Sequence, residues 1–209
     1  SDVPVLGGLF QILTVRNYDA EDGQVNQHVS VPEVDAKGDL AQQVNAEIQE
    51  RVDAHLAQAQ QVWEDYHDAF IATGGTEDEW SQREMNVDVN YEIKSQTDTT
   101  VSFVVTMTQD MFDAYNEQTY YNLDIAADKD ITLADVLGED WVNICNAAVQ
   151  TYIDQVTTGL FFSADEGGFT TVDEATSFYL NEDGSVTLVF PEYTIAAGAA
   201  GIVEIPVAG

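Results

Sequence analysis

The three histidines have the widest chemical range of any side chains in this chain, because imidazole binds metals and transfers protons near neutral pH. They are His28, His55 and His67. A zinc-binding helix places its two histidines four residues apart, on one helical face. His55 and His67 are twelve residues apart, and no His-Glu-x-x-His motif occurs. We therefore expect surface or helix-face histidines and no metal site.

Cys145 is the only cysteine, so the chain forms no internal disulfide. It lies in an apolar helical pattern with Trp141, Ile144 and Val149, which favours a buried and inert thiol. No Gly-x-Ser-x-Gly elbow and no phosphate-binding glycine loop occurs. The residue types therefore predict no nucleophilic catalysis, no catalytic residue and no cofactor.

Carboxylates are abundant, with 38 Asp and Glu residues. Among so many, two will lie at the separation used by glycosidases by chance, so the sequence nominates no catalytic pair. The acidic loop at residues 19–23 has the wrong register for an EF-hand, and the one at residues 128–130 contains a lysine. Residues 181–184, Asn-Glu-Asp-Gly, are typical of a hairpin turn. We expect no dedicated calcium site.

The net charge of −32 arises from these acids and only six Lys and Arg residues. Phosphate contacts need a basic surface, so this composition excludes most nucleic-acid-binding proteins and opposes docking on anionic lipid. Three interpretations remain: a solvated acidic surface, attraction of a basic partner, and binding of divalent cations. With 209 residues and 44% hydrophobic content, the chain can form one large domain or two small ones.

Periodicity predicts the elements that position these side chains. An amphipathic helix is expected from residue 39 to about residue 73, with apolar residues at i, i+4 spacing. A second is expected over residues 139–158, after a short helix at 131–138. Alternating residues predict strands, with Pro32 ending the second one, at 9–15, 25–31, 85–94, 99–107, 118–126, 178–180, 186–190 and 201–207.

The predicted fold class is α+β, with amphipathic helices packed on antiparallel β-sheets in two sub-domains. The N-terminal sub-domain, residues 1–82, contains the strand pair and the long helix. The C-terminal sub-domain, residues 83–209, contains the β-meander, the second helix and the hairpin.

Several sequence blocks in the C-terminal half carry a family resemblance. They are residues 121–124 (Tyr-Asn-Leu-Asp), 131–137 (Ile-Thr-Leu-Ala-Asp-Val-Leu), 178–180 (Phe-Tyr-Leu) with Gly184, 190–196 (Phe-Pro-Glu-Tyr-Thr-Ile-Ala) and 199–201 (Ala-Ala-Gly). In this order and spacing they resemble the extracellular domain of lysozyme-sensing anti-sigma factors of Gram-positive bacteria. Similar domains accompany a peptidoglycan deacetylase and occur in uncharacterised surface lipoproteins. Upstream, the helix with Asn45 resembles the companion N-terminal domain.

The resemblance implies an extracellular or cell-surface domain, tethered by an anchor upstream of this chain, that binds a protein or wall component without catalysis. In the anti-sigma factors the partner is C-type lysozyme, a basic protein. The chain departs from the family pattern in the loop after the predicted strand at 186–190. Glu192 replaces a Pro before the Tyr, Thr194 replaces a Glu, and Gly198 replaces an aromatic residue. A Gly-Gly-x-His stretch is absent, and residues 115–120 occupy roughly that place.

The candidate partner-binding residues are Pro191, Glu192 and Tyr193, with Tyr115 and Tyr120 as further aromatic candidates. Tyr193 has two interpretations, a core residue at the exit of a strand or a partner contact. Two other functions stay open. One is an enzyme or accessory domain of cell-wall metabolism that uses a carboxylate pair, and the other is a structural surface lipoprotein domain.

Overall fold

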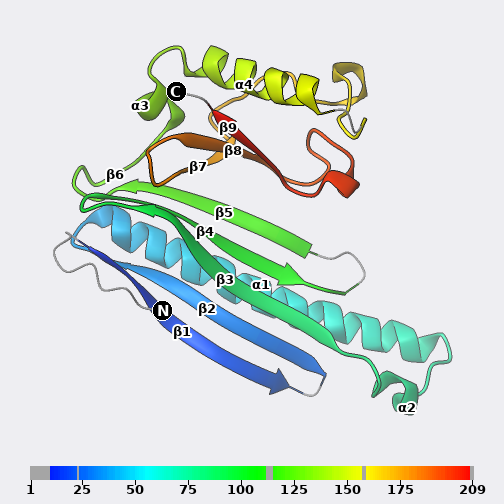
Figure 1. Cartoon of the computed structure of the whole chain (residues 1–209). Helices are drawn as coiled ribbons and strands as arrows, with labels where there is room; N and C mark the ends of the chain where they lie inside the picture. Colours follow the sequence, from blue (N-terminus) through cyan, green and yellow to red (C-terminus); the bar gives the residue numbers. More distant parts are fainter. Residues whose placement is uncertain (1–9, 23, 112–114, 157–158, 208–209) are drawn as a thin grey trace. The chain divides into compact units, whose positions relative to one another are not determined.

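The computed structural model describes residues 10–22, 24–111, 115–156 and 159–207 (Figure 1). The fold is α+β, as predicted from the sequence, with one six-stranded and one three-stranded sheet. The strands of the larger sheet, in the spatial order β1 to β6, are Gln11–Asp22, Val25–Asp35, Met85–Gln96, Thr100–Gln109, Tyr115–Asp124 and Lys129–Asp130. Those of the smaller sheet are β7 (Ser177–Leu180), β8 (Val186–Phe190) and β9 (Val203–Val207).

Four α-helices accompany these sheets in the described residues: α1 (Asp39–Ala72), α2 (Glu77–Trp80), α3 (Leu133–Leu137) and α4 (Trp141–Gln155). The long helix and the two later helices were predicted from the apolar periodicity. The single turn of α2 and the two-residue β6 were not, because elements so short carry no periodic pattern.

The chain forms two compact units that are not continuous in sequence. The first contains residues 1–92 and 104–119, and the second contains residues 93–103 and 120–209. The structure thus groups residues 83–92 and 104–119 with the N-terminal segment, whereas the sequence placed a division near residue 82. Strands β3, β4 and β5 each contribute to both units, which alternating hydrophobicity along a strand does not reveal.

One strand pair corrects the expectation of purely antiparallel sheets. Strands β2 and β3 are parallel, with Val25 opposite Met85 and Val29 opposite Val89. The physical reason is the long connection between them. A parallel pair needs a crossover, and α1 provides it by returning the chain to the end of the sheet where β2 began.

A second correction concerns Pro32, which does not end its strand. Strand β2 continues to Asp35, and Pro32 lies opposite Thr14 of β1. The register of this pair shifts between Thr14 and Arg16, as it does at a β-bulge. A proline has no N–H to donate, and a bulge is one of the few positions in a sheet where that loss is tolerated.

Helix α1 packs along the first unit with a single buried stripe. The stripe comprises Leu40, Ala41, Val44, Ile48, Val52, His55, Ala59 and Trp63. Near its start, Asn45 forms two hydrogen bonds with the backbone of Val34 on β2. The Val34 N–H donates to Oδ1 over 2.8 Å, and Nδ2 donates to the Val34 carbonyl over 3.0 Å. Midway along the helix, Arg51 forms an ion pair with Glu117.

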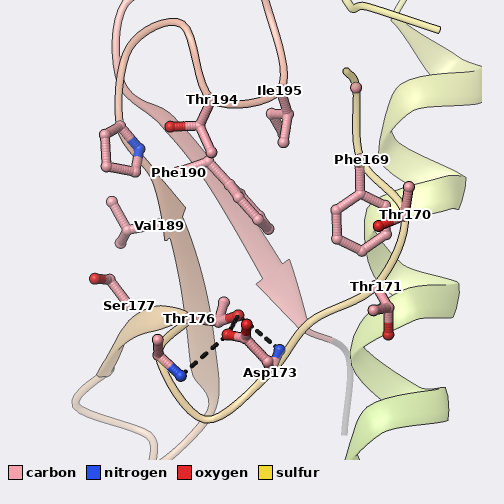
Figure 2. A pocket seen from close by; sticks show the side chains of 13 residues that line it. Phe169, Thr170, Thr171, Asp173, Thr176, Ser177, Val189, Phe190, Thr194 and Ile195 are labelled. Carbon is pink, nitrogen blue, oxygen red and sulfur yellow. Dashed lines mark hydrogen bonds between the residues drawn. The ribbon is translucent and has the colours of Figure 1, made fainter. Parts of the chain in front are cut away.

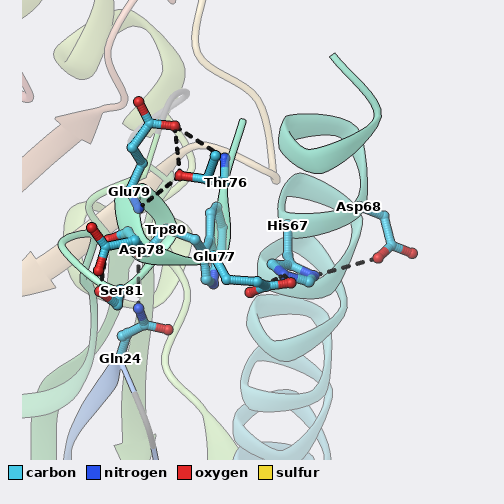
Figure 3. Close-up of polar contacts among 9 residues, drawn as sticks. All are labelled: Gln24, His67, Asp68, Thr76, Glu77, Asp78, Glu79, Trp80 and Ser81. Carbon is cyan, nitrogen blue, oxygen red and sulfur yellow. Dashed lines mark hydrogen bonds and ion pairs between the residues drawn. The ribbon is translucent and has the colours of Figure 1, made fainter. Parts of the chain in front are cut away.

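Helix α2 packs against α1 through Trp80. It begins with a capping box (Figure 3). The Thr76 hydroxyl accepts from the Glu79 N–H, and the Glu79 carboxylate accepts from the Thr76 N–H over 3.0 Å. Trp80 lies against Trp63, with ring centroids 4.5 Å apart. His67 of α1 reaches Glu77 of α2 at 3.2 Å. These contacts fix a segment that periodicity did not predict.

The second unit has its own apolar core between α4 and the three-stranded sheet. Its most buried members are Cys145 and Val149 of α4, Leu188 of β8 and Ile205 of β9. A buried polar network joins β7 to β4 and β5. The Ser102 hydroxyl donates to Asn122 Oδ1 over 2.6 Å and accepts from the Leu180 N–H over 3.0 Å. Asn122 Nδ2 donates to the carbonyl of Phe178 over 2.8 Å.

In the part of the chain that the structure describes, no helix combines the length and the apolar character needed to cross a membrane.

Candidate functional site

The loop after β8 carries three of the predicted contact residues, and buried residues hold it at both ends. All five residues of β8 are buried, and the last, Phe190, is 6% exposed. On the far side of the loop, Ile195 is 3% exposed, and its carbonyl accepts from the Phe162 N–H over 3.0 Å. The Thr194 N–H donates to the Pro191 carbonyl, which closes a tight turn. Residues 191–194 are therefore exposed on a fixed base.

Tyr193 is the most exposed large hydrophobic residue among those described, at 72%. Its φ of 63° lies in the left-handed region, which costs a non-glycine residue about 1 kcal/mol or more. A Cβ added at Gly198 would overlap the Tyr193 ring, so the ring lies directly over this glycine. Of the two sequence interpretations of Tyr193, the core position is wrong, whereas the neighbouring Phe190 is a core residue. An aromatic residue held exposed in a strained conformation suggests a function outside the core.

A cavity of about 360 Å³ adjoins this loop (Figure 2). Pro191 and Thr194 line it together with the end of β8 and the segment 168–177. Its apolar lining includes Phe169 and Phe190, whose rings meet edge to face with centroids 5.7 Å apart. The volume lies within the range of pockets that hold small ligands.

The polar lining of the cavity consists of hydroxyl groups and one carboxylate. The carboxylate is Asp173, and the hydroxyls belong to Thr170, Thr171, Thr176, Ser177 and Thr194. Asp173 Oδ1 accepts from the Ala175 N–H over 3.0 Å and from the Thr176 hydroxyl over 3.2 Å. The Thr176 hydroxyl in turn accepts from the Asp173 N–H (Figure 2). The cavity thus has an acidic group fixed by its own turn.

Of the other two predicted aromatic contacts, Tyr120 lies apart from this loop. Tyr120 of β5 is half-buried and stacks on Tyr179 of β7, with ring centroids 5.9 Å apart. Tyr179 lies opposite Thr187, near the start of β8, whereas Tyr193 follows its end. Tyr115 begins β5, but its side chain lies outside the described residues.

The three histidines and Cys145 do not form a common site among the described residues. His28 contacts Asp19 at 2.8 Å, and this hydrogen bond raises the pKa of His28. His55 is buried, its Nε2 donates to the Thr108 carbonyl over 3.3 Å, and burial lowers its pKa. His67 lies with Glu77, as described above. Cys145 is buried, as predicted, and burial raises its pKa to about 11.

Among the described residues, no group of three or more His, Cys, Asp or Glu side chains could hold a metal ion. No Asp or Glu side chain in these same ranges is buried. The observation that would favour an enzyme with a buried carboxylate pair is therefore missing from this part of the chain.

Comparison with protein families identifies the family of this chain. The sequence model of the family described as "protein of unknown function (DUF3298)" matches residues 29–208. The chain belongs to the DUF3298 family. A solved DUF3298 protein from Bacteroides fragilis is similar in fold, with a TM-score of 0.63 at 13% identity, over 96% of this chain and 90% of that one. A DUF3298 protein from Pseudomonas aeruginosa gives a TM-score of 0.47 at 14% identity, over 95% of this chain and 88% of that one. No curated protein matches in sequence.

These comparisons show membership of the DUF3298 family, and the solved Bacteroides fragilis structure shows the fold alone. The resemblance to lysozyme-sensing anti-sigma factors stays a prediction. The cavity was missed at the sequence level. Its only local signals are Gly168, where a Cβ would overlap the backbone of Phe162, and the following Phe-Thr-Thr run. Neither signal says that residues 168–177 and the loop after β8 meet in space, because that contact depends on tertiary packing.

Proposed function

We propose that this DUF3298 chain is a non-enzymatic binding domain of the cell surface that captures a basic protein. The observation that carries the proposal is Tyr193, an aromatic side chain that is 72% exposed in a left-handed turn. Aromatic residues of this kind are common anchors in protein interfaces. The family resemblance suggests C-type lysozyme as the partner and an extracellular position behind an upstream anchor.

Charge supports the same proposal. A net charge of −32 attracts a basic protein over distance and raises the rate of encounter. This attraction alone has little specificity and is screened beyond about 8 Å at physiological salt. The exposed ring of Tyr193 and the neighbouring carboxylate of Glu192 would then provide contacts that persist after screening.

Calorimetric titration with hen-type lysozyme at low and at physiological salt tests this function. Lactalbumin, which has a similar fold but is acidic, is the control partner. We expect 1:1 binding that survives physiological salt. Binding that is seen only at low salt would show attraction by charge without a specific surface, and would refute the proposal for lysozyme.

Variants of Tyr193 locate the contact. Tyr193→Asn removes the ring but suits the left-handed conformation, which asparagine tolerates, so the fold is retained. We expect a loss of affinity of about thirtyfold, the effect of removing a strong interface anchor. Tyr193→Phe keeps the ring and should bind within a few-fold of the wild type. Equal affinity for Tyr193→Asn and wild type would rule out this loop as the contact.

A matched pair of acidic variants separates local contact from overall charge. Glu192→Gln and Glu182→Gln each remove one negative charge from an exposed position, in the loop after β8 and in the β7–β8 turn respectively. If Glu192 contacts the partner, only the first variant weakens binding at physiological salt. If both act equally, the charge effect is general.

A further inference from the structure

We infer that the cavity beside the Tyr193 loop receives a lysine side chain of the basic partner. The inference rests on the proposed function, and it specifies which chemical group of the partner is recognised and where. The cavity and the loop form one surface, because Pro191 and Thr194, which flank Glu192 and Tyr193, also line the cavity. A partner that contacts Glu192 and Tyr193 therefore meets residues that are next in sequence to two that line the cavity.

The charge of the lining selects a cation. Among the described residues that line the cavity, Asp173 is the only one with a charged side chain, and none is Lys, Arg or His. Asp173 is exposed toward solvent, so an ammonium group can reach it without being buried. The apolar surface of Phe169, Phe190 and Ile195 can cover the methylene stem of a lysine while the charged end stays in a polar environment.

The hydrogen bonds of Asp173 favour lysine over arginine. Oδ1 already accepts two hydrogen bonds, from the Ala175 N–H and from the Thr176 hydroxyl. Within the described residues, Oδ2 has no partner. A guanidinium binds best when both carboxylate oxygens accept in parallel, whereas an ammonium acts as a point charge with three donors that can be directed separately.

Hydroxyl groups around the cavity supply the remaining acceptors. Thr171 accepts from the side-chain amide of Asn146 and donates to the Val172 carbonyl. The hydroxyls of Thr170, Ser177 and Thr194 also line the cavity, and they form no hydrogen bond with any residue that the structure describes. An ammonium that reaches Asp173 Oδ2 therefore has further oxygen acceptors in the lining of the cavity.

The first experiment uses a small probe and does not depend on lysozyme. Nα-acetyl-lysine-N-methylamide carries only the side-chain charge, and the matching norleucine derivative lacks the ammonium. We expect the lysine probe to shift the NMR signals of the threonine methyls at 170, 176 and 194, and the norleucine probe not to do so. Equal shifts from both probes would overturn the inference, because the cavity would then be merely apolar. Shifts from N-acetylglucosamine but not from the lysine probe would also overturn it, in favour of a saccharide pocket.

Two variants test the role of the carboxylate. Asp173→Asn removes the charge while its amide oxygen can still accept from Ala175 and Thr176, so the turn is preserved. Glu174→Gln removes the same charge from the neighbouring exposed position, which does not line the cavity. We expect Asp173→Asn to weaken the lysine probe about fivefold, and Glu174→Gln to leave it unchanged. Equal effects of the two variants would overturn the inference.

Failure of the inference can be told apart from failure of the proposed function. If lysozyme binds through Tyr193 and the lysine probe leaves the cavity signals unchanged, the capture of a basic protein stands and the lysine pocket is wrong. If the lysine probe binds at Asp173 and lysozyme does not bind, the pocket is supported and lysozyme is not the partner.

Discussion

Replacement of Asn45 by alanine is expected to destabilise the first unit far more than a polar substitution on a helix usually does. Asn45 accepts from the N–H of Val34, which is 1% exposed, and it donates to the Val34 carbonyl, which also accepts from the Ala36 N–H. Removal of the asparagine amide therefore leaves the buried Val34 N–H without a partner and takes one of two donors from the carbonyl. Strand β2 pairs with β3 only from Val25 to Val29, so at Val34 this side of the strand has no β3 neighbour. The asparagine amide takes the place that a neighbouring strand would occupy.

The expected cost follows from these two bonds. Each hydrogen bond contributes about 1 kcal/mol net, and a buried group left without a partner costs about 1–3 kcal/mol. Alanine recovers roughly 0.5 kcal/mol through its higher helix propensity. We therefore expect Asn45→Ala to lower the free energy of unfolding by about 2–4 kcal/mol. For a chain of this length, that corresponds to a fall in Tm of about 5–15 °C.

Urea denaturation followed by tryptophan fluorescence and circular dichroism measures this change, with Trp63 and Trp80 reporting on the first unit. Asn143→Ala is the matched control, because Asn143 is an exposed helical asparagine whose side-chain amide donates to Asp140, within its own helix turn. It gains the same helix propensity and should change stability by less than about 0.5 kcal/mol. A second variant, Asn45→Asp, keeps the acceptor for the Val34 N–H but loses the donor, and should also be destabilised. If Asn45→Ala and Asn143→Ala behave alike, the argument from the β2 edge is refuted.

Three further predictions follow from buried polar and ionisable groups. Ser102→Ala removes the centre of the β4–β5–β7 network and should cost about 2–3 kcal/mol in urea denaturation. Ser185→Ala, in the half-buried turn between β7 and β8, should cost less, and similar costs would contradict the network. The thiol of Cys145, with its pKa raised to about 11, should react with a disulfide reagent at pH 8 only after unfolding, and rapid labelling of the native protein would contradict its burial. Burial lowers the pKa of His55 in the folded state, so the unfolded chain binds the proton first as the pH falls below about 6.5. Its contribution to stability is complete above that pH and declines below it, and His55→Leu should flatten the slope between pH 6.5 and 5; an unchanged slope would contradict this assignment.

The fold class and the larger elements could be predicted because their signals are local. The stripe from Leu40 to Trp63 repeats at helical spacing over the whole of α1, and the turn at residues 181–184 ends in Gly184, whose φ of 81° is costly for other residues. The parallel β2–β3 pair could not be predicted, because alternation along a strand is the same for either direction of its neighbour. The prediction that Pro32 ends its strand was wrong for a related reason, because the bulge that tolerates this proline lies in the opposite strand, β1.

The candidate site could be predicted only in part. The loop after β8 was nominated from its sequence, and the structure exposes Pro191, Glu192 and Tyr193 together. Exposure itself was not predictable, because Phe190, Tyr193 and Ile195 are all large hydrophobic residues and only packing distinguishes them. Asp173 gave no signal, since it is one of 38 acidic residues and its significance comes from the cavity that it lines.

The positions that carry the family resemblance and the positions that depart from it have different physical roles. Asn45 and Asn122 each bond to the backbone of a neighbouring strand, and the Thr132–Asp135 pair forms the capping box of α3. These residues maintain the fold whatever the domain binds.

The departures at Glu192, Thr194 and Gly198 lie instead in and beneath the exposed loop. An aromatic side chain at 198 would compete with Tyr193 for the space that its ring now occupies, so glycine there determines how Tyr193 is presented. A resemblance based on fold-maintaining residues therefore specifies the family, whereas the ligand depends on a few exposed positions that vary without disturbing the core. For this reason the Tyr193 and Asp173 variants carry more information about function than any further comparison of the scaffold.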